Sequence, residues 1–445
     1  MDKIIRIENK INNFKKKIIV DGDKSISIRW ALLASQALGK STAYNLLRSE
    51  DVINTINCLK KLGVKIIWKE KYCEVFGNGL NSFKFKKNII LNAGNSGTLA
   101  RLIMGLLIRT PYKIKIIGDK SLSKRDFLRV IKPLRKFGVN FYPQNKNTLP
   151  IYMKGNNYLR PIEYFEDKGS AQIKSCIMLA ALNAPGITKI IAKKSRDHTE
   201  ILFKYLKIPL KITKKNNLNL IKIQSKNNIE PFNYIIPSDI SSSAFFIALT
   251  LLSKKSSLII KNVNINNSRI GSINILNKMG AKIVFKNKRK YKGEKLADIY
   301  VKSAKYLNSI KCSPKYNSSA IDEFLIIFLV AAKSKGISYF KDLSELNQKE
   351  SPRLKLGSKI LNMIGVKTKI TNHSIKIYGN PKLNLKKNYE IKNYMKDHRI
   401  FMVCTIAALT LGGKWKIHDS DSIKTSFPSF LKLIKQLGGK FRHEV

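Results

Sequence analysis

The segment LKKLGVKI, residues 59–66, decides the fold, because close copies of it recur along the chain. It predicts the last turn of an amphipathic helix, then a glycine able to adopt the left-handed conformation beyond the helix end, then a strand. Further copies carry this glycine as Gly138, Gly280, Gly365 and Gly438. A degenerate copy has Lys207 in its place. The spacing of roughly 70 to 85 residues predicts six α/β units.

Apolar stretches with helical periodicity predict a second set of helices. They cover residues 96–108, 171–182, 241–252, 321–332 and 399–411. Nearly all of them open with a cluster of polar or charged residues. Polar groups at so many helix starts favour one shared cleft over several separate sites.

The composition is unusually basic. The chain has 445 residues and a formal net charge of +55, carried mostly by lysines spread over its whole length. Nucleic-acid binders more often concentrate their charge in arms or on one face. The abundance of Lys, Ile and Asn favours genome composition bias as the explanation, with polyanion binding as the open alternative. Either way, the charge should attract anionic substrates.

The cysteine pattern and hydropathy predict a cytoplasmic protein. The five cysteines are scattered without a CxxC pair, which fits a reducing compartment and argues against structural zinc. The first residues show no secretory signal, and the apolar stretch 324–332 is about half the length of a membrane helix. We expect no metal, no cofactor and no membrane partner.

The segment DKSISIR, residues 23–29, places two cations and two hydroxyls where a helix is expected to begin. Helix N-termini offer unpaired N–H groups and a partial positive charge, which suit a phosphate or carboxylate. Taken alone, the segment favours an ordinary solvated helix start over an anion site. Its meaning depends on partners elsewhere in the chain.

Those partners are further motifs along the chain: GNSGT at 94–98, Arg125, SAQ at 170–172, SRDHTE at 195–200, IDE at 321–323, KESPR at 349–353, DHR at 397–399 and SFP at 426–428. Together with DKSISIR they resemble one family, the 5-enolpyruvylshikimate-3-phosphate synthases of the enolpyruvyl transferase group. Eight motifs follow in the family's order from Asp21 to Phe430. The resemblance implies an α/β fold of two similar domains, each of three repeated α/β units, with the active site in the cleft between them. It places one domain at residues 22–238 and a discontinuous one at 1–21 and 239–445. Substrates that bridge the halves would drive closure and exclude water.

The implied reaction transfers the enolpyruvyl group of phosphoenolpyruvate to the 5-hydroxyl of shikimate 3-phosphate and releases phosphate, in the pathway to chorismate and aromatic amino acids. The resemblance assigns shikimate 3-phosphate to Lys24, Ser25, Arg29, Ser170, Ala171, Gln172, Ser195, Asp322 and Lys349. It assigns phosphoenolpyruvate to Lys24, Gly97, Arg125, Gln172, Arg353 and Arg399. It implies no cofactor and a monomer whose partners are these two small molecules.

The chemistry explains these residue types. Two phosphates and two carboxylates bring roughly five to six negative charges into one site, which a ring of lysines and arginines can hold. By resemblance Glu350 protonates C3 of phosphoenolpyruvate, Asp322 takes the proton of the 5-hydroxyl, and Lys24 assists. We expect Glu350 to be protonated only when both substrates are bound.

The sequence departs from the family pattern at Asn347, at Pro352 and at Asp126, and also has Asp21-Gly22-Asp23 where Pro-Gly-Ser is usual. Lys424 lies one position out of register with the family's late active-site lysine. These departures leave the rate open.

Two rival functions remain. The sister enzyme that transfers enolpyruvyl to UDP-N-acetylglucosamine has Lys-Asn in place of Lys24-Ser25 and uses a loop cysteine, whereas the loop 119–125 has none. The other rival is a catalytically weakened polyanion-binding homologue.

Overall fold

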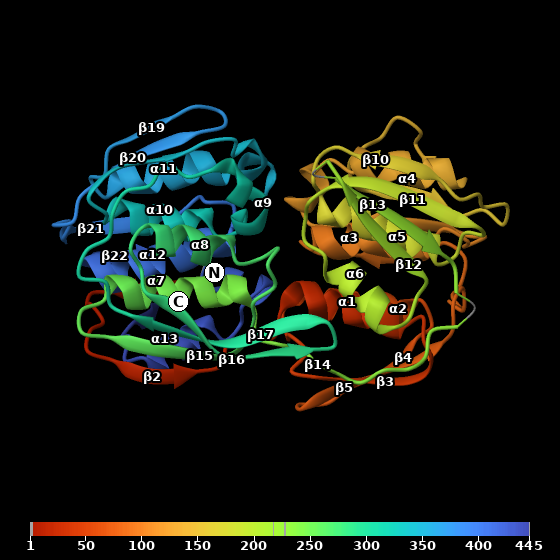
Figure 1. The fold of residues 1–445 in the computed structure, drawn as a ribbon, viewed down its shortest axis with the longest axis horizontal. Coiled ribbons are helices and arrows are strands. Elements are labelled where there is room, and N and C mark those ends of the chain that lie inside the picture. The colour runs from red at the N-terminus through yellow and green to blue at the C-terminus, as the bar shows by residue number, and fades with distance from the viewer. Residues whose placement is uncertain (1–2, 217, 227, 445) are drawn as a thin grey trace. The chain divides into compact units, whose positions relative to one another are not determined.

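The computed structural model describes residues 3–216, 218–226 and 228–444, and the chain divides into two compact units (Figure 1). Unit 1 comprises the chain up to Asp21, Pro237–Lys290 and the chain from Lys295 onward. Unit 2 comprises Gly22–Ile236 and the short segment Tyr291–Glu294. The chain therefore passes from one unit to the other four times. The predicted domain ends at residues 1–2 and 445 lie outside the described residues.

Unit 2 repeats one supersecondary motif. In each repeat a buried helix precedes a strand, a second helix follows that strand, and two antiparallel strands complete the sheet. The second repeat consists of β6 (Ile90–Asn92), α3 (Gly97–Leu106), β7 (Lys113–Ile117), α4 (Leu128–Phe137), β8 (Asn140–Tyr142) and β9 (Ile151–Lys154). The third consists of β10 (Glu163–Glu166), α5 (Ala171–Ala181), β11 (Ile187–Lys193), α6 (His198–Tyr205), β12 (Leu210–Lys215) and β13 (Leu218–Gln224). Their sheets have the equivalent orders β6-β7-β9-β8 and β10-β11-β13-β12.

The first repeat of unit 2 takes its edge strand from far along the chain. Its elements are α1 (Lys24–Ala34), β3 (Leu38–Tyr44), α2 (Glu50–Lys61), β4 (Lys65–Trp68), β5 (Tyr72–Asn78) and β14 (Tyr234–Ile235). The order β14-β3-β5-β4 matches that of the other two sheets, and β14 pairs parallel to β3 as β6 does to β7. The end of unit 2 thus closes its own first sheet.

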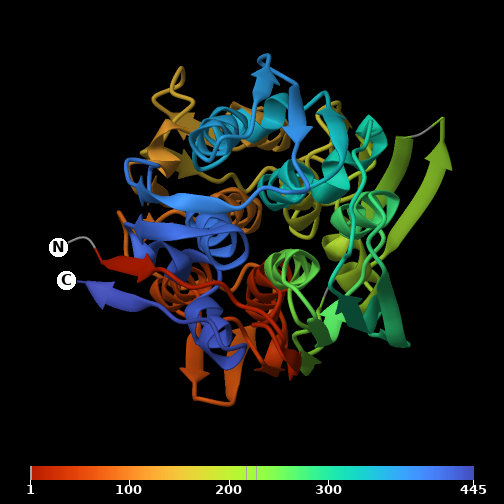
Figure 2. The same cartoon turned by 90° about the vertical axis from the view of Figure 1, so that its left-hand side faces the viewer.

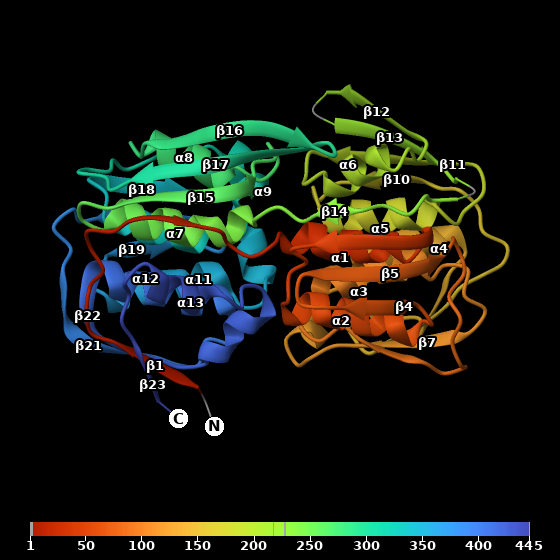
Figure 3. The same ribbon diagram turned by 90° about the horizontal axis from the view of Figure 1, so that it is seen from below.

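Unit 1 repeats the same motif. Its first repeat holds β2 (Lys15–Ile18), α7 (Ile240–Leu252), β15 (Ser257–Asn264), α8 (Gly271–Lys278), β16 (Ile283–Tyr291) and β17 (Glu294–Lys302). The second holds α10 (Phe324–Ala332), β18 (Gly336–Phe340), α11 (Arg353–Met363), β19 (Thr368–Ile370) and β20 (Ile375–Gly379). The third holds β21 (Leu385–Ile391), α12 (His398–Leu411), β22 (Gly412–Ile417), α13 (Phe430–Gln436), β23 (Arg442–Glu444) and β1 (Ile4–Ile7). Figure 2 shows β1 (red) beside β23 (blue), which pair antiparallel, and Figure 3 shows the long hairpin β16–β17.

The five predicted apolar helices are confirmed, and the structure buries them. They form α3, α5, α7, α10 and α12. Every residue of α10 and of α12 is buried, and in unit 1 these two helices pack against each other and against α7. In unit 2, α3 packs along α5 and also contacts α1. Helices that are apolar all round can only be stable in such an interior, with the sheets outside them.

The repeated glycine phrase also behaves as predicted, because each copy ends a helix in the left-handed conformation. The φ angles are 86° at Gly63, 106° at Gly138, 94° at Gly280, 81° at Gly365 and 95° at Gly438. Lys207 of the degenerate copy has φ 53°. The six α/β units are therefore present among the described residues. No helix within residues 3–216, 218–226 and 228–444 is long and apolar enough to cross a membrane.

Candidate functional site

Unit 2 places Lys24 at the start of α1. Asp23 is the N-cap, and its Oδ1 accepts a hydrogen bond of 2.9 Å from the Ile26 N–H. Gly22 has to be glycine here, because a Cβ would lie 2.2 Å from the carbonyl oxygen of Asn45. The Lys24 ammonium lies 2.9 Å from Asp51 Oδ2 and remains partly exposed. The helix start is therefore tightly built around an accessible cation.

Arg29 is almost fully buried one turn further along α1. Its Nε donates to Thr199 Oγ1 at 2.8 Å, its Nη2 donates to Ser175 Oγ at 3.0 Å, and its Nη1 donates to the Ser25 carbonyl at 3.1 Å. The hydroxyls of Ser175 and Thr199 lie 2.7 Å apart. These three acceptors orient the guanidinium. Helices α1, α5 and α6 thus hold Arg29 together.

Gly97, the first residue of α3, lies against two guanidiniums. A Cβ at this position would meet Arg101 Nη1 at 2.8 Å and Arg125 Nη1 at 3.1 Å. Arg125 is oriented by Asn95, whose Oδ1 accepts from Nη2 at 3.1 Å. The start of α3 therefore lies beside two positive charges, which is an arrangement that suits an anion.

Gln172, in the first turn of α5, links α5 to Arg101 and Thr98 of α3. Its Oε1 accepts from Arg101 Nη1 at 2.7 Å, and its Nε2 donates to Thr98 Oγ1 at 3.0 Å. Ser170 caps α5 by accepting from the Ile173 N–H at 3.4 Å, which leaves Ala171 as the first helical residue. Because Gln172 and Ser175 share α5, the structure brings the predicted residues Arg29, Gly97, Arg125 and Gln172 into one connected set.

The predicted residue Ser195 lies between β11 and α6. Its Oγ is buried and has no hydrogen-bond partner among the described residues. A buried hydroxyl without a partner calls for an explanation, and a bound ligand is one. Lys174, by contrast, is fully buried in an ion pair of 2.5 Å with Glu200 and so holds α5 against α6. This lysine is structural.

In unit 1, Arg353 is the centre of the other predicted group. It begins α11 and is about 1% exposed. Its Nε lies 2.9 Å from Asp397 Oδ2, its Nη2 lies 2.5 Å from Glu350 Oε2, and its Nη1 lies 3.6 Å from Asp322 Oδ1. A single rigid fork therefore orients three carboxylates, including both residues predicted to move protons.

The buried pair of Arg353 and Asp397 is strongly coupled. Burial alone would raise the pKa of Asp397, but the facing guanidinium outweighs burial and holds that pKa below its ordinary value. Burial also opposes the charge of Arg353, yet Asp397, Glu350 and Asp322 raise its pKa above the ordinary value. Both groups therefore stay ionised near neutral pH.

Asp322 is surrounded by cations. Lys349 Nζ lies 3.5 Å from its Oδ1, and Arg399 Nη1 donates to its backbone carbonyl at 2.7 Å. Arg399 is itself placed by Asp397, which caps α12 and accepts from the Arg399 N–H at 2.9 Å. The predicted residues Asp322, Lys349, Glu350, Arg353 and Arg399 therefore lie together in unit 1.

The departures from the family pattern have local explanations. Pro352 is the N-cap of α11, where its missing N–H removes no helical hydrogen bond. Asp126 contributes its carbonyl oxygen, which accepts from Arg101 Nη2 at 3.1 Å and which any residue would supply. Lys424 is exposed in a short 3-10 helix, and the side-chain amide of Asn347 donates to the Asn372 carbonyl.

Sequence reasoning left four supporting residues out of the site. They are Asp51, Arg101, Thr199 and Asp397. Three of them lie within or beside motifs that were recognised, so their positions gave a signal. Asp51 gave none, because only the fold brings the start of α2 to Lys24.

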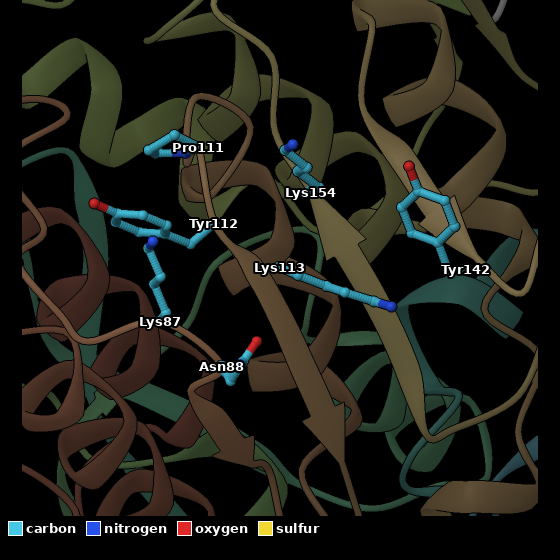
Figure 4. A pocket seen from close by; sticks show the side chains of 7 residues that line it. All are labelled: Lys87, Asn88, Pro111, Tyr112, Lys113, Tyr142 and Lys154. Atoms are coloured by element: carbon cyan, nitrogen blue, oxygen red, sulfur yellow. The ribbon is translucent and has the colours of Figure 1, made fainter.

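A shallow hollow of about 360 Å³ lies elsewhere on unit 2 (Figure 4). Its lining residues are Lys87, Asn88, Pro111, Tyr112, Lys113, Tyr142 and Lys154. None of them belongs to the predicted site. Cation–π contacts occupy part of this lining, since Lys113 Nζ lies 5.2 Å from the ring of Tyr142.

Comparison with solved structures defines the class of fold. EPSP synthase from Acinetobacter baumannii superposes with a TM-score of 0.87 at 32% identity, covering 100% of both chains. The enolpyruvyl transferase NikO from Streptomyces tendae superposes with a TM-score of 0.78 at only 12% identity, which supports the fold alone. The protein therefore has the enolpyruvyl transferase fold, as predicted.

Sequence comparison narrows the class to one family. The family described as EPSP synthase (3-phosphoshikimate 1-carboxyvinyltransferase) matches residues 8–434. A 3-phosphoshikimate 1-carboxyvinyltransferase of Ruthia magnifica is 38% identical over 96% of each chain. One from Zymomonas mobilis is 37% identical over 96% of this chain and 94% of its own. The chain belongs to the EPSP synthase family, and the predicted resemblance is confirmed.

Proposed function

We propose that this protein transfers the enolpyruvyl group of phosphoenolpyruvate to the 5-hydroxyl of shikimate 3-phosphate and releases inorganic phosphate. This is the activity named for its relatives, and it serves the shikimate pathway to chorismate and the aromatic amino acids. The observation that carries the proposal is the contact group of unit 1, in which Arg353 holds Asp322 and Glu350 at once. The reaction needs one base and one acid at the same substrates.

In this proposal unit 2 supplies the binding site for shikimate 3-phosphate. Arg29, with Ser25, Ser170, Gln172 and Ser195, binds shikimate 3-phosphate. The buried Oγ of Ser195, which has no hydrogen-bond partner among the described residues, and the two hydroxyls that orient Arg29 support this assignment. Guanidinium forks suit phosphate because they donate two parallel hydrogen bonds.

Phosphoenolpyruvate lies in this proposal against Gly97 and Arg125, with Arg353 and Arg399 as further cations. The position of Gly97 beside Arg101 and Arg125 supports this placement, because a Cβ at Gly97 would lie 2.8 Å from Arg101 Nη1 and 3.1 Å from Arg125 Nη1. Lys24 serves both anions from the start of α1. Its ion pair with Asp51 keeps the ammonium in place before substrates arrive.

The addition step then needs two proton transfers. Asp322 accepts the proton of the 5-hydroxyl as its oxygen bonds to C2 of phosphoenolpyruvate, and Glu350 delivers a proton to C3. The tetrahedral adduct loses inorganic phosphate, and the C3 proton returns to a base. Lys349 Nζ and Arg353 Nη1 lie 3.5 Å and 3.6 Å from Asp322 Oδ1 and so hold the proposed base in place. Glu350 acts only when protonated, which we assign to the state with both substrates bound.

UDP-N-acetylglucosamine transfer is not favoured by the comparisons, which name shikimate-phosphate enzymes. The thiol chemistry agrees, since all five described cysteines are buried. Burial raises the pKa of the Cys58 and Cys176 thiols to about 12, so neither forms a thiolate at neutral pH.

The acceptor can be tested directly. Phosphate release is measured with phosphoenolpyruvate plus either shikimate 3-phosphate or UDP-N-acetylglucosamine. We expect release only with shikimate 3-phosphate. Release with the nucleotide sugar alone would overturn the proposal, and no release combined with salt-sensitive RNA retention would favour the polyanion-binding alternative.

We further propose a cytoplasmic monomer without a dedicated nucleic-acid partner. The five free cysteines suit a reducing compartment. Light scattering coupled to size exclusion checks the monomer, for which we expect the mass of one 50.6 kDa chain.

A further inference from the structure

The tip of the hairpin β16–β17 belongs to unit 2, although the rest of both strands belongs to unit 1. The tip consists of Tyr291, Lys292, Gly293 and Glu294. Lys292 and Gly293 have φ angles of 49° and 90°, which makes a two-residue turn of the type that fits the twist of a hairpin. The domain limits predicted from the sequence assigned residues 291–294 to the discontinuous domain, together with the rest of the hairpin.

Each tip residue makes a specific contact within unit 2. A Cβ at Gly293 would lie 2.7 Å from Ile201 Cγ2, so the turn rests directly on α6. The Tyr291 hydroxyl accepts from the Ile235 N–H at 2.9 Å. The Lys292 ammonium lies 4.8 Å from the ring of Tyr205 and 5.5 Å from those of Tyr234 and Tyr291. An ammonium among three aromatic rings is a strong anchor.

Glu294 makes the most buried of these contacts. Its Oε1 lies 2.6 Å from Nδ1 of His198, and the two side chains are 1% and 0% exposed. His198 is the first residue of α6, and the next residue is Thr199, whose hydroxyl accepts from Arg29. A buried hydrogen bond of this kind is expensive to break, because the group left behind cannot reach water.

We propose that Glu294 is a positioning residue for the proposed shikimate 3-phosphate site. It fixes His198 at the start of α6, and α6 in turn holds Thr199 where it orients Arg29. Glu294 does not itself touch the substrate. The inference rests on the proposed function, since it assigns Arg29 to shikimate 3-phosphate.

The test compares Glu294→Ala with Glu294→Gln. We expect Glu294→Ala to raise the KM for shikimate 3-phosphate about tenfold, with kcat and the KM for phosphoenolpyruvate within about twofold of wild type. Glu294→Gln should restore that KM to within about twofold of wild type, because its amide oxygen can accept the same hydrogen bond from His198. Calorimetric binding of shikimate 3-phosphate should follow the KM values.

Ile221→Val is the matched control for stability. Ile221 is buried in β13 of the same repeat, and losing one methyl group there costs about 1 kcal/mol. This variant should melt lower than wild type with unchanged KM values. If Glu294→Ala does not fold, Gly293→Ala carries the test, because its methyl group pushes the tip off Ile201 and should raise the same KM several-fold.

Three results would overturn the inference. They are an unchanged KM for shikimate 3-phosphate in Glu294→Ala, an equal rise in both KM values, and no rescue by Glu294→Gln. Failure of the proposed function looks different, because the wild-type protein itself would then neither bind shikimate 3-phosphate nor release phosphate. That result would overturn both proposals.

Discussion

Gly97 shows how one missing side chain shapes the site. Its Cβ would lie 2.8 Å from Arg101 Nη1 and 3.1 Å from Arg125 Nη1. We expect Gly97→Ala to raise the KM for phosphoenolpyruvate about tenfold, which corresponds to about 1.4 kcal/mol. The KM for shikimate 3-phosphate should change little. Steady-state kinetics with each substrate varied in turn checks this, and an equal change in both values would contradict the placement.

Glu350 is the proposed proton donor to C3. Glu350→Gln keeps the shape of the side chain but cannot deliver the proton, so turnover should fall by at least about 10²-fold. Calorimetry should find shikimate 3-phosphate binding within about threefold of wild type. Turnover near the wild-type rate would show that another group is the acid.

The pair of Arg353 and Asp397 allows a test of stability against pH. Asp397→Asn keeps the cap of α12, because asparagine caps as well as aspartate, but it removes a charge facing a buried guanidinium. We expect a loss of about 3 kcal/mol in the free energy of unfolding at pH 7, measured by urea denaturation.

The sign of the pH dependence follows from the depressed pKa of Asp397. Its contribution to stability is fully present above the unfolded value near ~3.9 and is lost as pH falls through the lower folded value. The difference between wild type and Asp397→Asn should therefore narrow below about pH 4. A constant difference down to pH 2.5 would contradict the coupling.

At the residue scale, the motifs predicted which side chains gather, and the structure explains why. Gly97 and Gln172 lie in the first turns of α3 and α5, Arg29 lies one turn into α1, and Arg125 lies in the loop before α4, all within segments that the motifs already marked. Asp51 and Glu294 could not be found in this way, because neither lies in a recognised motif. Only the folded chain brings Asp51 to Lys24 and Glu294 to His198. The residue roles in catalysis stay predictions.

At the scale of elements, the six helix ends share one conformation, and only one of them lacks glycine. Lys207 adopts φ 53°, a region that strains residues with a Cβ. We expect Lys207→Gly to raise the free energy of unfolding by about 1 kcal/mol, measured by chemical denaturation. Lys204→Gly, an exposed position inside α6, is the control and should lower it by about 1 kcal/mol.

The repeat made the helices and strands predictable. The helix-end phrase marks where a helix stops and a strand follows, and each apolar stretch marks a buried helix. The exchange of strands was not predictable in this way. β14 closes the first sheet of unit 2 from the far end of that unit, and β1 enters the last sheet of unit 1 beside β23. Such pairings depend on which sheet edges are unpaired once the units have folded. They cannot be predicted from any short stretch of sequence.

At the scale of the whole molecule, the net charge of +55 should act on encounter with anionic substrates. We expect kcat/KM for shikimate 3-phosphate to fall several-fold as potassium chloride rises from about 0.05 to 0.5 M, since screening shortens the reach of exposed charges. Saturated kcat should change much less. A kcat/KM that is independent of salt would mean that the excess charge plays no part in encounter.

The central claim is that this protein catalyses enolpyruvyl transfer. The reaction itself tests that claim most directly. The most direct measurement uses phosphoenolpyruvate labelled with ¹⁸O in the bridging oxygen, mixed with shikimate 3-phosphate and the protein. Addition at C2 followed by elimination breaks the carbon–oxygen bond, so the label should appear in the released inorganic phosphate. Label retained in pyruvate, or no release at all, would contradict enolpyruvyl transfer by this protein.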